Sequence, residues 1–269
     1  MGAPSPVRRR RTRKAAFLRT LKFARSDLAR LGLLAAVVLL FIGIIFFARL
    51  TDGLPDTREL LAHRHEPSFL VLDKTGQKIG ARGLTQGEFV SISEMPRYLP
   101  LAVMAVEDRR YYRHMAVDLS GMARAAFTNI KAHHIVQGGS TITQQLAKML
   151  FLTPERTYKR KLQEVLLAFW LEHKLSKDQI LEIYLNRAYL GAGTHGVESA
   201  AQRYFGKSAR RVTLVEAAML AGLLKAPSFY APTSSIARAG TRTGLVLDEM
   251  VEAGFITKRE RLNAPREPA

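Results

Sequence analysis

QGGSTITQQLAK, residues 137–148, is the most informative stretch of this chain. A Gly-Gly turn leads into a run of hydroxyl and amide side chains that ends at Lys148, and the apolar sequence MLFL follows at once. Exposed backbone N–H groups, hydroxyls and a cation beside an apolar patch suit a ligand with a phosphate head and a lipid tail. The alternative is a polar loop that caps a helix at Thr141 or Thr143.

Most of the chain after Pro96 has the apolar spacing of α-helices, which predicts a mainly α-helical domain over residues 96–263. Three helix starts carry a capping-box pattern, in which Ser or Thr precedes Gln or Glu by three positions. The three pairs are Ser176 with Gln179, Thr213 with Glu216, and Thr257 with Glu260.

The first 48 residues predict a membrane anchor. Residues 1–30 hold ten Lys or Arg and one acid, and residues 31–48 read LGLLAAVVLLFIGIIFFA. Such a span is near the lower limit for a transmembrane helix, and its basic flank predicts a cytoplasmic N-terminus. We expect a single-pass protein of the inner (cytoplasmic) membrane with its main domain on the periplasmic, extracytoplasmic side. A cleaved signal peptide is the alternative.

Between the anchor and the helical domain, residues 49–95 are expected to form a stalk. Alternating residues around Gly76, within residues 68–92, predict a small β-hairpin there. Residues 264–269 are expected to be a tail. The net charge of +18 favours anionic partners, although the apolar span beside the basic arm argues against nucleic acid. The chain has no cysteine, so its core must hold without disulfides.

Two carboxylates stand out from the other charged residues. An apolar helix runs into Glu107, and Tyr111 and His114, four and seven positions later, are expected on the same face. This arrangement suits a general base. The alternative is an ordinary salt bridge between the Glu107-Asp108 pair and one of the arginines that follow it, Arg109, Arg110 or Arg113.

The second carboxylate is Glu164, on an apolar helical face. Arg160 and Lys161, one turn earlier, are its expected partners. A buried structural ion pair is the plain interpretation. However, two separated carboxylates are typical of glycosyl chemistry, and clustered cations can stabilise a phosphate leaving group. The cluster consists of Lys148, Arg156, Arg160 and Lys161.

Other motif matches do not indicate a site. GAGTHG, residues 191–196, spells a dinucleotide fingerprint but follows a predicted helix, whereas the fingerprint needs a preceding strand. His133 and His134 lack partners at metal-ligand spacing, so no metal site is predicted.

Several blocks, in order between Leu99 and Pro232, resemble family 51 glycosyltransferases. That family is the peptidoglycan polymerase module of class A penicillin-binding proteins and of monofunctional transglycosylases. The blocks are EDRRYYRH, GGSTITQQLAK, RKLQE, SKDQILEIYLNRAYLG with GVESAAQRYFGK, and LVEAAMLAGLLKAPS. The resemblance implies a lysozyme-like helical domain that joins lipid II units.

By the same resemblance, Glu107 deprotonates the acceptor 4-hydroxyl, which attacks C1 of the growing chain and expels undecaprenyl pyrophosphate with inversion. Glu164 would orient substrate or a neighbouring cation. The implied pyrophosphate-binding side chains are Lys148, Arg156 and Lys161, with Arg160 in the same cluster. Ser140, Thr141, Gln144 and Gln145 would line the cleft, and Asp108, His114 and Asn186 would support it.

The implied partners are lipid II, the growing glycan chain, membrane lipid and other cell-wall synthesis proteins, with no nucleic acid. A divalent cation, Mg²⁺ or Mn²⁺, often assists in the family, but no residue here identifies its site. The amphipathic flap of the family would be Phe127–Val136, dipping into the lipid interface. The chain departs from the family pattern at Tyr111, usually Phe, and at Ala116, usually Gly.

Two other functions fit parts of the pattern. A muramidase or lytic transglycosylase would cleave glycan with similar carboxylates but has no need of the cation cluster. A non-catalytic, membrane-tethered scaffold would need the basic charge but not Glu107. The sequence is compatible with a monofunctional polymerase and with a fragment of a bifunctional penicillin-binding protein.

Overall fold

A computed structural model of the chain describes residues 32–34, 36–45, 48–49, 69–72, 74–75, 78–82, 85–132, 138–153, 155 and 157–265. The chain divides into two units, residues 1–53 and 54–269. In the first unit, residues 32–34 and 36–45 are helical, with exposed apolar side chains such as Leu33 and Phe41. None of the helices in the described ranges is both long and apolar enough to cross a bilayer. Four residues of the predicted 31–48 span, at positions 31, 35, 46 and 47, lie outside those ranges.

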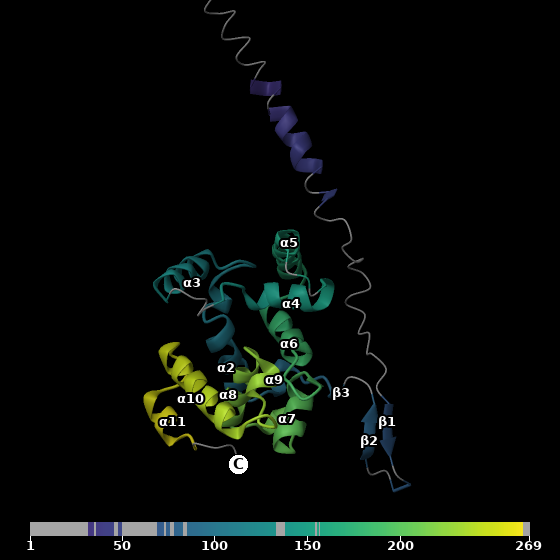
Figure 1. Cartoon of the computed structure of the whole chain (residues 1–269), viewed down its shortest axis with the longest axis vertical. Helices are drawn as coiled ribbons and strands as arrows, with labels where there is room; N and C mark the ends of the chain where they lie inside the picture. Colours follow the sequence, from purple (N-terminus) through teal and green to yellow (C-terminus); the bar gives the residue numbers. More distant parts are fainter. Residues whose placement is uncertain are drawn as a thin grey trace, which may run out of the picture. The chain divides into compact units, whose positions relative to one another are not determined.

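The second unit is mainly α-helical, as the apolar spacing predicted (Figure 1). Its longer helices are α2 (Tyr98–Glu107), α3 (Leu119–Ala132), α4 (Ile142–Phe151), α5 (Tyr158–Lys174), α6 (Lys177–Arg187), α7 (Val197–Phe205), α8 (Leu214–Leu223) and α10 (Ile236–Glu252). The short helices are α9 (Pro227–Tyr230) and α11 (Lys258–Asn263), with 3-10 turns η1 (Ile92–Glu94), η2 (Tyr111–Arg113) and η3 (Ala209–Arg211).

The strands are few and short. β1 (Phe69–Leu72) pairs antiparallel with β2 (Lys78–Arg82), and Lys74 and Thr75 lie in the turn between them. β3 (Thr85–Gln86) pairs parallel with β4 (Thr194–His195), far along the chain. The β3–β4 pair was not expected, because two-residue strands leave no periodic signal in a sequence.

Helix α8 is the centre of the core. Its residues from Val215 to Leu223 are all buried, and α2 and α10 both pack against it. Alanines and Gly222 on α8 let these neighbours approach closely, so the three helices make a dense layer. Because α2 is held in this layer, the position of its C-terminal residue, Glu107, is fixed by the core.

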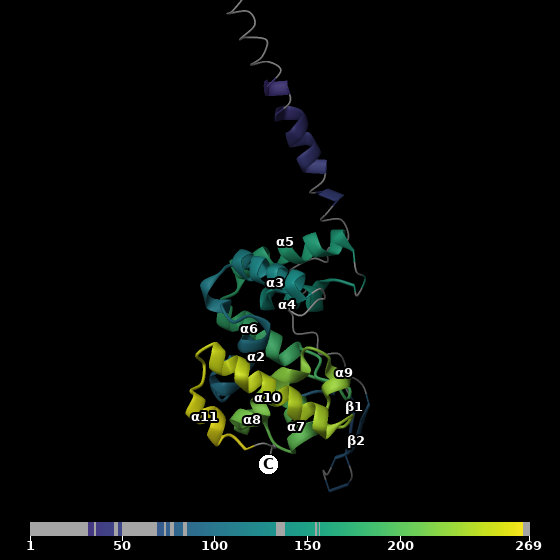
Figure 2. The ribbon, with the colours of Figure 1, turned by 60° about the vertical axis from the view of Figure 1, so that its left-hand side comes forward.

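A second group of helices forms around α4, which packs against α5 and α6. In both views α3, α4 and α5 lie together at one end of the unit, and α7, α8, α10 and α11 lie at the other (Figures 1 and 2). The three predicted capping boxes are confirmed, at the starts of α6, α8 and α11.

The glycine-rich sequence GAGTHG follows α6, as predicted, and forms a tight turn rather than a nucleotide loop. Gly191 has a φ of 86°, and an added Cβ would lie 2.7 Å from the carbonyl oxygen of Pro227. The glycine therefore allows a left-handed backbone and a close approach of two chain segments.

Candidate active site

Glu107 is the last residue of α2, and its carboxylate is partly buried. The helix ends there because Asp108 leaves helical geometry, with φ −160° and ψ 76°. The amide of Gln145, on α4, donates to Glu107 through Nε2 and Oε2 at 2.6 Å. A carboxylate at a helix C-terminus also faces the partial negative charge of the terminal carbonyls, which disfavours its ionised form.

The expected grouping of Tyr111 and His114 with Glu107 is wrong. Because α2 stops at Glu107, the helical spacing does not continue, and His114 Nε2 instead lies 2.7 Å from Oδ1 of Asp108. Burial lowers the pKa of His114, but hydrogen bonds to Asp108 and to the Met115 carbonyl outweigh it and leave that pKa raised. Tyr111 is buried and donates to the carbonyl of Lys177 at 2.8 Å.

Within the described part of the chain, the alternative salt bridges from Glu107 or Asp108 to Arg109, Arg110 or Arg113 do not form either. Arg109 pairs with Glu252 at 3.0 Å, and Arg110 pairs with Asp118. Asp108 is used in a different way, because its Oδ2 accepts the backbone N–H of Ile142 at 3.3 Å. The residue after Glu107 thus attaches the end of α2 to the start of α4.

The central stretch of sequence builds the start of α4. Thr141 is the N-cap, and it forms a capping box with Gln144, so the plain interpretation of this threonine is confirmed. Thr141 Oγ1 also donates to the carbonyl of Ala116 at 2.7 Å. Both Thr141 and Gln144 are buried, and their polar atoms are largely engaged within the protein.

Glu164 is buried on α5 and pairs with both expected cations. Arg160 Nη1 donates to one carboxylate oxygen, and Lys161 Nζ lies 2.9 Å from the other. Lys161 also donates to Ser140 Oγ at 2.7 Å and lies 3.4 Å from Gln144 Oε1. The ammonium therefore connects α5 to the start of α4.

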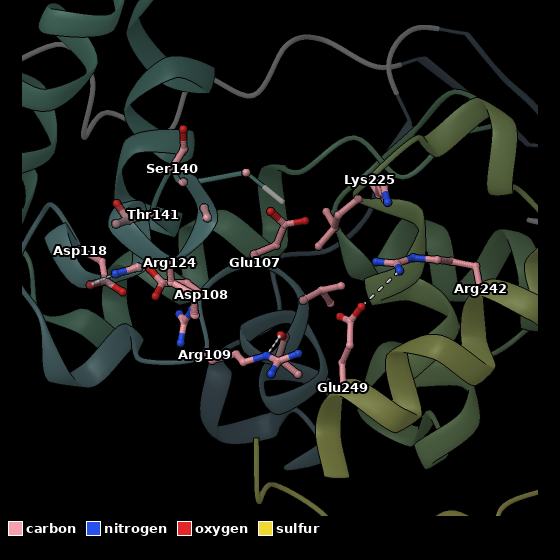
Figure 3. A pocket seen from close by; sticks show the side chains of 17 residues that line it. Glu107, Asp108, Arg109, Asp118, Arg124, Ser140, Thr141, Lys225, Arg242 and Glu249 are labelled. Atoms are coloured by element: carbon pink, nitrogen blue, oxygen red, sulfur yellow. Dashed lines mark hydrogen bonds and ion pairs between the residues drawn. The ribbon is translucent and has the colours of Figure 1, made fainter. Parts of the chain in front are cut away.

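Two adjoining cavities meet at Glu107. The smaller, of about 260 Å³, brings together five predicted site residues: Glu107, Ser140, Gln145, Lys148 and Glu164. The larger, of about 390 Å³, shares Glu107 and Ser140 with it and extends toward α3, α8 and α10. In Figure 3, Glu107 lies between Arg242 and Lys225 on one side and Asp118 and Arg124 on the other.

Comparison with known proteins identifies the family of this chain. Residues 75–251 match the family model for transglycosylases. The chain belongs to the transglycosylase family. This confirms the resemblance to the transglycosylase modules of class A penicillin-binding proteins that the ordered sequence blocks indicated.

The relatives are much longer than this chain. Penicillin-binding protein 1A of Aquifex aeolicus (strain VF5) is 44% identical over 239 residues, which cover 88% of this chain and 33% of the relative. Penicillin-binding protein 1A of Neisseria flavescens is 43% identical, with 88% and 30% covered. A crystal structure of penicillin-binding protein 1A from Haemophilus influenzae is 27% identical, with a TM-score of 0.43, over 72% of this chain and 20% of that one. The transglycosylase chain thus spans about a third of the curated relatives it matches.

The larger cavity of this transglycosylase is lined by charged residues that were not predicted from the sequence. Arg242 is buried on α10, its Nη1 lies 3.4 Å from Glu249 Oε1, and its Nε has no hydrogen-bond partner in the described parts of the chain. The sequence does contain a sign of this residue. Arg242 takes a position on the apolar face of α10, whose other members include Ala239, Val246 and Met250.

The surroundings of Glu107 determine its proton affinity. Burial raises its pKa, and the hydrogen bond from Gln145 opposes that shift. The positive charges of Arg242 and Lys148 also lower the pKa of Glu107, whereas the negative charge of Glu249 raises it. The net effect is a raised pKa, as a general base working near neutral pH requires.

Some predicted residues lie elsewhere. Asn186 lines neither cavity, and its side chain instead binds the backbone of Val90, accepting at 2.9 Å and donating at 2.8 Å. These bonds hold α6 against the segment before η1. Arg156, His133 and His134 lie outside the described residues.

Asp108, His114 and Asp118 bring three ligand-type atoms within 4.8 Å of one another. These groups are already engaged, because Asp108 binds His114 and Asp118 accepts from Arg110 and from the Gly121 amide. The set therefore does not fit a divalent cation without breaking existing bonds, and we assign none of the three as a metal ligand.

Proposed function

We propose that this chain is a peptidoglycan glycosyltransferase that polymerises lipid II into glycan strands. The observation that carries the proposal is Glu107, a carboxylate with a raised pKa at the junction of two cavities that both contain cations. Membership of the transglycosylase family supports the same reaction. Two cavities on either side of one base suit a reaction between two glycan substrates.

In the proposed reaction, Glu107 accepts the proton of the acceptor 4-hydroxyl. The hydroxyl oxygen then forms a bond to C1 of the growing chain, while the bond from C1 to the pyrophosphate oxygen breaks. A single displacement inverts the configuration at C1, and undecaprenyl pyrophosphate leaves with the electron pair.

The leaving pyrophosphate needs positive charge, which the smaller cavity offers. Lys148 lines it directly, and Glu164 in its wall holds Arg160 and Lys161 in place. We propose that Glu164 orients these cations rather than transferring a proton. Fixed charges of this kind stabilise a developing anion without reorganisation. Arg156 is proposed to join them on the basis of the family resemblance.

We also propose that the enzyme works at the surface of the inner membrane. The predicted 31–48 anchor and cytoplasmic basic arm support a periplasmic catalytic domain. Phe127 and Ile130 on α3 are strongly exposed, which supports contact between the predicted flap and lipid.

Polymerisation of purified lipid II by the full chain in detergent tests the reaction. The wild type should make glycan strands that can be separated on a gel, and Glu107→Gln should make no detectable strands. Glu88→Gln is the matched control, because Glu88 is exposed and pairs with Arg210, and neither residue lines either cavity.

Two outcomes would support the other functions. Cleavage of finished glycan without any polymerisation would indicate a lytic enzyme. Neither polymerisation nor cleavage by the wild type would favour the non-catalytic scaffold, whereas polymerisation that survives Glu107→Gln would mean that a group other than Glu107 is the base.

The leaving-group site has its own test. Lys148→Ala should weaken binding of a moenomycin-type phosphoglycolipid about tenfold or more, because a charged hydrogen bond contributes about 1.5–3 kcal/mol. Lys159→Ala is the control, since Lys159 is exposed and outside both cavities. Equal affinities for the two variants would exclude Lys148 from the phosphate site.

A further inference from the structure

Gln145 connects Glu107 to a buried tyrosine. Its Nε2 donates to Glu107 Oε2 at 2.6 Å, and its Oε1 accepts from the hydroxyl of Tyr184 at 3.0 Å. The three side chains come from α4, α2 and α6, and Tyr184 is only 2% exposed. The tyrosine lines neither cavity, so it reaches the site only through Gln145.

The charge of Glu107 sets which groups donate and which accept along the hydrogen bonds from Tyr184 through Gln145 to Glu107. An ionised carboxylate can only accept, so the amide of Gln145 must present its N–H group to Glu107. Its carbonyl oxygen then faces Tyr184, and the hydroxyl must donate to it. The opposite amide orientation would place two acceptors against each other at Glu107.

Tyr184 can keep this role at any pH at which the enzyme works. Burial raises the pKa of its hydroxyl well above the ordinary value, and the negative charge of Glu107 adds to that shift. The hydroxyl therefore keeps its proton and stays a donor. Gln145 in turn has one orientation that satisfies both of its neighbours.

We propose that Tyr184 is a positioning residue for the reaction proposed above, acting by holding the amide of Gln145 with its N–H group toward Glu107. The proposal rests on the proposed function for its kinetic part only. Its structural part, the effect of Tyr184 on the proton affinity of Glu107, stands independently of the substrate.

Other charged groups line the two cavities that share Glu107, and a variant that removes only the tyrosine hydroxyl leaves each of these groups present. They are Asp108 and Arg109 beside it, Asp118 before α3 and Arg124 on it, Lys148 on α4, Glu164 on α5, Lys225 after α8, and Arg242 and Glu249 on α10. A change on removing the hydroxyl therefore reports on Gln145. Without Tyr184 as donor, the amide can turn its oxygen toward the carboxylate, which disfavours the ionised base.

Tyr184→Phe in the full chain, assayed in detergent with lipid II, is the decisive variant. We expect kcat at neutral pH to fall about tenfold, the size of one buried hydrogen bond, with KM little changed. The acidic limb of the kcat profile should move to higher pH. Tyr204→Phe is the matched control, because the Tyr204 hydroxyl donates to the Leu190 carbonyl at 2.9 Å and Tyr204 lines neither cavity.

A double variant tests whether Tyr184 acts through Gln145. Gln145→Leu combined with Tyr184→Phe should lose no more activity than Gln145→Leu alone, because residues in one network are not additive. Additive losses would overturn the proposal. So would a Tyr184→Phe profile that matches the wild type or Tyr204→Phe.

A measurement without substrate separates this proposal from the proposed function. In protein labelled with ¹³C at glutamate carboxyls, the Glu107 signal, assigned by its loss in Glu107→Gln, should titrate at higher pH in Tyr184→Phe than in the wild type. Tyr184→3-fluorotyrosine keeps the ring and strengthens the donor, so it should shift the titration the other way. No shift in either variant overturns the role of Tyr184, even if the wild type polymerises lipid II. If the Glu107 titration shifts as expected but the wild type makes no polymer, the proposed function is overturned and the role of Tyr184 stands.

Discussion

Arg242 crosses α8 at Gly222, where an added Cβ would lie 2.9 Å from Arg242 Cγ. The absence of a side chain at Gly222 thus lets a buried arginine pass between two core helices and reach the larger cavity. A glycine in the α8 core thus determines where Arg242, whose charge lowers the pKa of Glu107, can lie.

Gly222→Ala should therefore lower the stability of the protein and displace the Arg242 side chain. Overpacking of a dense core costs about 1–3 kcal/mol of unfolding free energy, measurable by denaturant unfolding. Gly240→Ala is the control, since that glycine lies in α10 with nothing within 4 Å of an added Cβ. It should stabilise the protein by about 0.4–1 kcal/mol. A loss of stability in both variants would mean that close approach at Gly222 is not the cause.

Neutralising the two α10 charges should move the acidic limb of the pH–rate profile in opposite directions. Glu249 raises the pKa of Glu107, so Glu249→Gln should shift that limb to lower pH. Arg242 lowers the pKa of Glu107, so Arg242→Met should shift the limb to higher pH. Profiles of kcat/KM for lipid II measure both, and shifts of the same sign would contradict this account.

Glu107→Gln should stabilise the protein while it removes activity. Burial raises the folded-state pKa of Glu107 above its unfolded value. The stability linked to this group is therefore fully present below the unfolded pKa and is lost as the pH rises through the folded pKa. At pH 7 the variant should melt a few degrees higher than the wild type, and this difference in Tm should disappear at about pH 4. A lower Tm at pH 7 would mean that the ionised carboxylate is stabilised where it lies.

Asn186→Ala should lower stability without changing the chemistry. Both hydrogen bonds to the Val90 backbone would be lost, and part-buried groups left unpaired cost about 1–3 kcal/mol. Thermal unfolding should show the loss, while kcat and the phosphoglycolipid affinity of the folded enzyme stay near wild type. A large fall in kcat with an unchanged Tm would restore Asn186 to the site.

The helical fold was predictable because its signals are local. Capping boxes and apolar spacing place the helix starts, and the spacing of Arg160, Lys161 and Glu164 on one helix predicts their ion pairs. The helical spacing misplaces His114 because it does not continue past Glu107, where α2 ends. That end is fixed by Asp108, whose partner is the amide of Ile142 on another element, and a local pattern cannot show such a partner.

The cavity beyond Glu107 was harder to predict. Arg242 and Glu249 are far along the chain from Glu107, and only the packing of α2 and α10 on α8 brings them together. A buried arginine in an apolar stripe is visible in the sequence, but its direction depends on Gly222. The hydrogen bonds between Asn186 and Val90 and the β3–β4 pair also join segments far apart in the sequence, so local patterns do not predict them.

The junction of Asp108 with Ile142 also bears on how the chain folds. Glu107 ends one helix, and its amide partner Gln145 lies just inside another, so the site exists only after segments 98–108 and 141–145 have met. Contacts between distant segments form more slowly than local helices. A refolding chain should therefore regain its helical circular dichroism before its lipid II turnover, and a collapsed but undocked intermediate would be helical and inactive.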